Sequence, residues 1–226
     1  MSLNQILVAV DGPSASGKSS VVKNVAKRLN FKLIDSGLFY RAVTYVLSKI
    51  SLNSNRDLKD DLTKIEIEYK NSKMFYKGID ITEDCRSPEI DKLVGEYASI
   101  QDVRDFVNSL LRNFMLNSKH SYIVEGRDIG SFVLPNADIK FFITASAEER
   151  ALRRQKQQTQ LSYEETLKII KDRDFKDKNR SIAPLICVKD AILIENDKLS
   201  LDETVDLITE KIEKCIKENK KDQSPL

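Results

Sequence analysis

The chain has 226 residues, 41% of them hydrophobic, and its 37 Lys and Arg nearly balance 35 Asp and Glu, leaving a net charge of +2. This length suits one core domain with small insertions, and the mixed charge lacks the basic excess of a duplex-binding protein. The longest apolar run near the N-terminus, residues 6–10, is too short for a signal-peptide core or a membrane span. Three scattered cysteines without CxxC spacing indicate reduced thiols. We therefore expect a cytoplasmic protein that binds neither nucleic acid nor membranes. A monomer is also expected, although composition does not fix the oligomeric state.

Short apolar runs alternate with helical patterns along most of the chain. The predicted strands are residues 6–10, 31–34, 121–124, 139–143 and 191–194. Helical segments separate them, the first at about 18–29. Because strands that alternate with helices form parallel βαβ units, we predict an α/β fold with a five-stranded parallel sheet flanked by helices.

Residues 64–82 interrupt this alternation. Ile65–Tyr69 alternates with period two, Asn71-Ser72 is a plausible turn, and two further short apolar runs follow at 74–76 and 79–81. This pattern predicts a small antiparallel β insert. We expect residues 51–63 to form a polar connector into it, and the core to consist of residues 1–63 and 83–226.

Helix starts mark the second half of the chain. An amphipathic pattern covers 103–114. Ser146-x-x-Glu149 and Ser162-x-x-Glu165 are capping-box patterns, which place helix starts at about 147 and 163. The polar residues 156–161 predict a mobile turn, and the charged residues 217–226 a frayed end.

A phosphate-binding motif, G-x-x-x-x-G-K-[ST], lies between the first strand and the first helix, where its chemistry requires it. Glycines let backbone N–H groups turn toward phosphate oxygens, and the helix N-terminus adds partial positive charge. We expect Lys18 to reach the β- and γ-phosphates and the Ser19 hydroxyl to ligate Mg²⁺. The motif spans the residues Gly12, Pro13, Ser14, Ala15, Ser16, Gly17, Lys18 and Ser19. A small-residue loop that binds nothing is the alternative, and the motif alone does not choose between kinase, GTPase and ATPase.

Polar side chains follow two other predicted strands. Ser36 ends the second strand with Arg41 just beyond it, and Arg127 and Asp128 end the third. Ligands of open parallel sheets bind beyond the carboxyl ends of the strands, so we expect these residues to converge with Lys18 in one crevice. Taken alone, Arg41 or Asp128 is more often a surface charge.

Two arginine clusters occur on predicted helices. Arg173, Asp177 and Arg180 share one helix face, where guanidinium forks suit phosphate oxygens and a carboxylate suits ribose hydroxyls. An exposed, ion-paired helix is the alternative.

The other cluster consists of Arg150, Arg153 and Arg154, within a predicted helical lid at about 147–173. Arginines over a transferring phosphate stabilise its spread charge. The alternative for this cluster is a solvated helix face.

The combination of GPSASGKSS at 12–20, LIDSGLFYRAVT at 33–44, the segment 124–154 that contains GRDIG, and RDFKDKNRSIAPL at 173–185 resembles bacterial-type cytidylate kinase, a nucleoside monophosphate kinase. The resemblance implies a P-loop NTPase-type fold. It also implies transfer of the γ-phosphate of ATP, with Mg²⁺, to CMP or dCMP. We expect alignment and charge neutralisation to drive this transfer without a general base, because a phosphate with a second pKa of about 6 is largely ionised at pH 7.

The resemblance also assigns roles to matching positions. Binding of the ATP phosphates falls to Gly12, Pro13, Ser14, Ala15, Ser16, Gly17, Lys18, Ser19 and Ser20. Catalytic roles fall to Lys18, Arg127, Arg180, Arg150, Arg153 and Arg154. Binding of CMP falls to Ser36 and Arg41 beside the nucleotide, Ser99, Arg104 and Asp128 at the cytosine, Arg173 and Asp177 at the ribose, and Arg127 and Arg180 at the acceptor phosphate. The spacing between Ser99 and Arg104 is about one helical turn shorter than the family pattern, which could alter base preference.

Three other functions compete with this one. A guanylate or uridylate kinase would share the phosphate loop. A GTP-binding switch would need an N/TKxD segment, and Asn196-Asp197-Lys198 has the wrong order. Intact Lys18 and Ser19 argue against a catalytically silent nucleotide-binding subunit.

Overall fold

The computed structural model describes residues 5–50, 58–157 and 161–221. The chain divides into two compact units, Met1–Leu33 with Lys119–Leu226, and Ile34–Ser118. We call them the first and second units and describe each by itself. The bounds expected for core, insert and lid stay predictions.

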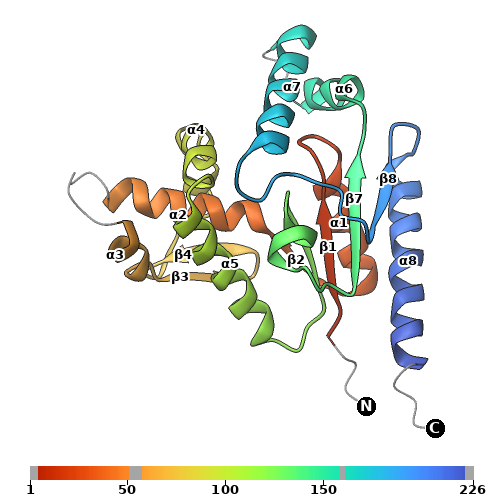
Figure 1. Cartoon of the computed structure of the whole chain (residues 1–226), viewed down its shortest axis with the longest axis horizontal. Helices are drawn as coiled ribbons and strands as arrows, with labels where there is room; N and C mark the ends of the chain where they lie inside the picture. Colours follow the sequence, from red (N-terminus) through yellow and green to blue (C-terminus); the bar gives the residue numbers. More distant parts are fainter. Residues whose placement is uncertain (1–4, 51–57, 158–160, 222–226) are drawn as a thin grey trace. The chain divides into compact units, whose positions relative to one another are not determined.

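A five-stranded sheet with the order β2-β6-β1-β7-β8 organises the first unit (Figure 1). Its strands are β1 (Leu7–Asp11), β2 (Lys32–Asp35, of which the first two residues belong to this unit), β6 (Tyr122–Glu125), β7 (Ile139–Thr144) and β8 (Ala191–Glu195). β1 pairs in parallel with β6 and β7, and β7 pairs in parallel with β8. The predicted parallel sheet is therefore confirmed, each strand to within one residue.

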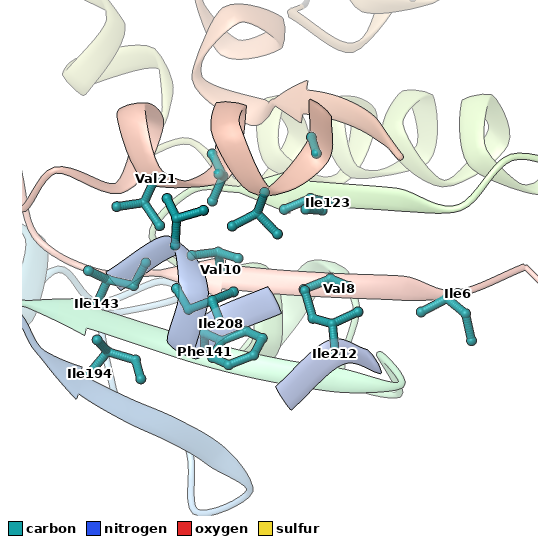
Figure 2. Close-up of a cluster of buried hydrophobic side chains, with 14 residues drawn as sticks. Ile6, Val8, Val10, Val21, Ile123, Phe141, Ile143, Ile194, Ile208 and Ile212 are labelled. Atoms are coloured by element: carbon teal, nitrogen blue, oxygen red, sulfur yellow. The ribbon is translucent and has the colours of Figure 1, made fainter. Parts of the chain in front are cut away.

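Helices follow the strands of this unit, as the alternating pattern predicts. They are α1 (Lys18–Leu29), α6 (Ala147–Gln157), α7 (Tyr163–Asn179) and α8 (Leu201–Lys221), together with the π-helical turn η2 (Ile129–Val133). Side chains of α1 and α8 share one apolar core with the strands (Figure 2). Ile6, Val8 and Val10 point into this core because alternate residues of a strand face the same side.

The second unit contains the antiparallel sheet β3-β4-β5. Its elements are α2 (Ser36–Ile50), α3 (Leu58–Thr63), β3 (Ile67–Lys70), β4 (Lys73–Tyr76), β5 (Ile79–Asp80), the 3-10 turn η1 (Asp84–Arg86), α4 (Pro88–Tyr97) and α5 (Gln101–Leu116). Asn71 and Ser72 both have positive φ, 52° and 60°, as a two-residue hairpin turn requires. The predicted antiparallel insert is confirmed.

Tyr69 packs this sheet against two helices of the same unit. Its ring centroid lies 5.1 Å from that of Phe39 on α2 and 5.2 Å from that of Phe114 on α5. The amphipathic helix expected over 103–114 is confirmed, because α5 buries Val103, Val107 and Leu111.

Three polar segments differ from expectation. Residues 58–63 of the expected connector form helix α3, which buries Leu62 and carries Asp60 and Asp61 in its first turn, where acidic groups favour a helix start. Lys156 and Gln157 of the expected turn still belong to α6, and α8 continues to Lys221 where fraying was expected. The remaining residues of these calls, 51–57, 158–160 and 222–226, lie outside the described part of the chain.

Both predicted helix starts are correct, but only one carries the full capping box. At Ser162 the side chain accepts from the backbone N–H of Glu165, and the Glu165 carboxylate accepts from that of Ser162. At Ser146 the serine caps Glu149, but the Ser146 N–H goes to Asp197. The Glu149 carboxylate instead pairs with Arg153, one turn further along α6.

Candidate active site

The phosphate loop lies directly on the backbone of β7. A Cβ added to Gly12 would be 2.0 Å from the carbonyl oxygen of Ile143, so this residue must be glycine. Gly17, with φ 85°, is the N-cap of α1 and offers no side chain to cap it. The backbone N–H groups at this helix start therefore stay available to an anion.

Lys18 is buried at the base of the loop, with 6% of its surface exposed. Its Nζ donates to the carbonyl oxygens of Gly12 at 2.9 Å and Pro13 at 3.0 Å. Burial, and after it the charge of Arg127, lowers the pKa of the Lys18 ammonium to about 7, although Glu125 and Asp11 oppose this shift. Its charge therefore responds strongly to any phosphate bound nearby.

Two buried carboxylates lie close to the loop. The Ser19 hydroxyl donates to Oε2 of Glu125 at 2.7 Å. Asp11 accepts the backbone N–H of Ile129 at 2.8 Å and that of Gly130 at 2.7 Å. Burial raises the pKa of the Asp11 carboxyl to about 6, against these hydrogen bonds. Asp11 thereby ties the end of β1 to the turn that follows Arg127 and Asp128.

The predicted residues that follow β6 form two ion pairs with predicted residues at the end of α7. Nε of Arg127 lies 3.1 Å from Oδ2 of Asp177, and Nη2 of Arg180 lies 3.5 Å from Oδ1 of Asp128. The charge of Arg127 also acts on Lys18, so this cluster adjoins the phosphate loop. Arg180 is the C-cap of α7 and has extended backbone angles, so it lies one residue beyond the helix. The prediction that it shares a helix face with Arg173 and Asp177 was therefore wrong.

The three arginines of α6 have different surroundings. Arg150 is buried and forms a two-pronged ion pair with Asp174, at 3.0 Å and 2.6 Å, while Nη1 also donates to the carbonyl of Ser14 in the phosphate loop. Arg153 donates to both Oδ1 and the backbone carbonyl of Asn196.

The side chain of Arg154, by contrast, is half-buried and makes no hydrogen bond or ion pair with the described residues. Arg173 is exposed on α7.

The remaining predicted residues belong to the second unit. Arg104 is buried on α5, donates to the carbonyl of Ala98 at 2.9 Å and lies over the ring of Tyr40, 5.5 Å from its centroid. Ser36 is buried one helical turn before Tyr40 on α2.

Two further predicted residues make contacts within this unit. Arg41 pairs with Asp91, and Ser99 is exposed, with its hydroxyl donating to the carbonyl of Glu96. The expected convergence of Ser36 and Arg41 with Lys18 stays a prediction.

Sequence reasoning missed four residues at this site. They are Asp11, Glu125, Asp174 and Asn196. Glu125 carried a usable signal, because a charged residue at the end of an otherwise apolar buried strand needs a partner. The others have partners more than twenty residues away in the sequence, and no local pattern marks them.

The sheet order and the loop define a P-loop nucleotide-binding protein. A family model described as cytidylate kinase matches residues 8–214. The chain therefore belongs to the cytidylate kinase family, a family of kinases.

Relatives named cytidylate kinase resemble the chain over most of its length. The one from Pseudothermotoga lettingae is 40% identical and covers 91% of this chain and 93% of its own. The one from Clostridium botulinum strain Langeland is 39% identical, over 90% and 95% of the two chains. The one from Fusobacterium nucleatum is 35% identical, over 94% and 99%.

A solved structure of an uncharacterized protein from Eubacterium ventriosum is similar in fold. Its TM-score is 0.55 at 16% identity, and the match covers 92% of this chain and 99% of the other. At this identity the likeness concerns the fold alone. In the described part of the chain no helix is long and apolar enough to cross a membrane.

Proposed function

We propose that this protein transfers the γ-phosphate of ATP to CMP or dCMP, giving ADP and CDP or dCDP. The observation that carries the proposal is the match to the cytidylate kinase family across residues 8–214, which includes the intact phosphate loop and Lys18. The nucleotides are the expected partners, and we keep the expectation that the enzyme acts as a monomer.

On the donor side, Gly12–Ser20 would surround the phosphates of ATP. Lys18 supports this role because its buried Nζ already lies among loop carbonyls and gains a stronger partner when phosphate arrives. Arg150, Arg153 and Arg154 would complete the donor side from α6. Two of the three already contact the loop or the segment beside it.

On the acceptor side, Arg127 and Arg180 would bind the phosphate of CMP. Both are paired with carboxylates in this structure, and a phosphate dianion would compete for the same guanidinium donors. Arg173 and Asp177 would hold the ribose. The residues proposed to line or read the cytosine nucleotide are Ser36, Arg41, Ser99, Arg104 and Asp128.

The donor set at Ser19 fits Mg²⁺. The Ser19 hydroxyl lies 2.7 Å from the buried Glu125 carboxylate, and both supply the hard oxygen atoms that Mg²⁺ prefers. Among the described residues, no group of three or more His, Cys, Asp or Glu is arranged to hold a metal ion. In nucleotide sites Mg²⁺ is usually held by one or two protein oxygens together with substrate phosphates and water. When bound, the ion would neutralise charge on the β- and γ-phosphates.

The chain's own residues align the reactants and hold positive charge. A CMP phosphate oxygen attacks the γ-phosphorus and ADP leaves, so no side chain has to remove a proton. Lys18 and the arginines stabilise the negative charge that spreads over the transferring group. Asp128 accordingly serves in binding and not as a base.

Turnover with a panel of acceptors tests the proposal. ADP formation from ATP and Mg²⁺ would be followed with CMP, dCMP, UMP, GMP, AMP and dTMP. Strongest turnover with CMP and dCMP is expected. Preference for GMP or UMP would replace the base assignment, and absence of acceptor-dependent turnover would favour a GTP-binding switch or a silent subunit.

A further inference from the structure

A buried side-chain cluster joins the residue after β8 to the phosphate loop. Asn196 is 3% exposed, and its Nδ2 donates to the carbonyl oxygen of Ser16 at 2.9 Å. Its Oδ1 accepts from Nη1 of Arg153 at 3.0 Å, and Nη2 of Arg153 donates to the Asn196 carbonyl at 2.8 Å. The amide of Asn196 is thus oriented from both ends.

This contact fixes the direction of one peptide group of the loop. In a planar trans peptide the C=O and the following N–H point in opposite directions. Because Asn196 holds the Ser16 carbonyl, the N–H of Gly17 points away from Asn196. A Cβ added to Gly17 would lie 3.5 Å from Asn196 Nδ2 and 3.6 Å from Arg153 Nη1, so both side chains lie close against the loop here.

Rigid elements anchor the cluster on its other side. The backbone N–H of Asn196 donates to Thr144 at 2.9 Å, next to the pairing of β7 with β8. Oδ1 of the next residue, Asp197, accepts the N–H of Ser146 at 2.9 Å, where α6 begins. Asn196 and the helix that carries Arg153 are therefore both fixed to strand ends, and a group held on such elements positions its partner well.

We propose that Asn196 is a positioning residue for the donor nucleotide. By holding the Ser16 carbonyl outward it presents the Gly17 N–H to the phosphates, and so it tightens binding of ATP and ADP. The inference rests on the proposed function, because it requires that the loop binds a nucleoside phosphate. The inference also gives a role to Asn196-Asp197-Lys198, the segment that resembles the N/TKxD motif of GTP-binding switches but has the wrong order.

Asn196→Asp tests the two contacts of the side-chain amide separately. The variant keeps an oxygen acceptor for Arg153 and nearly the same volume, but it places a second oxygen against the Ser16 carbonyl. The Kd for ADP, measured by titration calorimetry, and the KM for ATP should rise at least about tenfold, while the KM for CMP changes less than about twofold. Asn24→Asp is the matched control, because exposed Asn24 on α1 also donates to a backbone carbonyl, that of Ser20, and ADP affinity should not change.

Other outcomes overturn the inference. If Asn196→Asp lowers the Tm but leaves ADP affinity and the KM for ATP unchanged, Asn196 is merely structural. An equal rise in the KM values for ATP and CMP would also refute a role at the donor phosphates. Asn196→Ala removes the donor without adding a repelling oxygen, and it should weaken ADP binding in the same direction even if the aspartate variant does not fold. If the unaltered protein binds no ADP, the proposed function fails together with the inference, whereas normal ADP binding by both folded variants overturns the inference alone.

Discussion

Binding of ADP at pH 8 should make the protein take up a proton at Lys18. Burial and the charge of Arg127 lower the pKa of this ammonium to about 7 in the nucleotide-free protein. At pH 8 about a tenth of the molecules would therefore carry the charge. A diphosphate beside Nζ raises the pKa again, because an opposite charge favours the ionised form. Lys18 should therefore take up most of one proton per ADP at pH 8, and much less at pH 6.

Titration calorimetry in buffers of different ionisation enthalpy measures this uptake. The slope of the observed binding enthalpy against the buffer's ionisation enthalpy gives the number of protons transferred. The ADP phosphate, with a second pKa of about 6, is already ionised at pH 8, so its own titration does not contribute to the measured proton uptake. Lys18→Arg keeps its charge at this pH and should give a slope near zero. A slope near zero for the unaltered protein would refute the argument, because Lys18 would then be charged before the nucleotide binds.

Three further predictions concern the loop and its supports. Lys18→Ala should lower kcat at least about 100-fold, since it removes the charge that stabilises the transferring phosphate. An unchanged circular dichroism spectrum would show that the fold survives loss of this buried side chain, and near-normal turnover would contradict the mechanism. Burial raises the pKa of Asp11 from 3.8 to about 6, so ionisation of Asp11 costs the folded protein stability as the pH rises through that window. Asp11→Asn removes this cost, and its free energy of unfolding relative to the unaltered protein should rise by about 2 kcal/mol between pH 4.5 and 7.5 in urea denaturation; a pH-independent difference would argue against it. Asp174→Ala leaves the buried Arg150 guanidinium without its carboxylate and should cost about 3–5 kcal/mol, whereas the exposed control Asp172→Ala on the same helix should cost little; equal losses would exclude a special role for the pair.

Local patterns predicted most elements of the fold, and their failures have local causes. Helix α1 begins and ends where its pattern predicts, because an apolar stripe and the motif lysine mark it. The short helix α3 was missed because its polar sequence offers few apolar positions, and one of its two buried residues, Asp61 beside Leu62, is charged. At Ser146 the capping-box pattern predicted the helix start correctly. The predicted partner of the Ser146 N–H was wrong, because the acceptor, Asp197, follows β8 and lies 51 residues further along the chain.

The residues of the site also divide into those that a local sequence pattern marks and those that no local pattern marks. The phosphate loop is a local motif, so its eight positions could be recognised together. The contact from Asn196 to Ser16 spans 180 residues and that from Asp11 to Ile129 spans 118. A single sequence shows neither, because the side chains have no fixed spacing and become neighbours only when parallel strands bring their ends to one edge. Asn196 and Asp11, whose partners lie in distant parts of the chain, were therefore missed, whereas the loop contacts Arg150 and Arg153 belong to a predicted cluster.

The three arginines of α6 were predicted from the sequence as one cluster, but the structure gives each of them different contacts. Arg150 donates to Asp174 and to the Ser14 carbonyl, and Arg153 to Asn196, so moving either onto a transferring phosphate would leave buried polar groups behind. Such a move is costly unless the nucleotide replaces the lost partners. Arg154 has no such ties to the described residues and could approach a phosphate without that cost. Within the proposed lid, charge stabilisation would then fall first to Arg154, while Arg150 and Arg153 hold the loop that receives the donor.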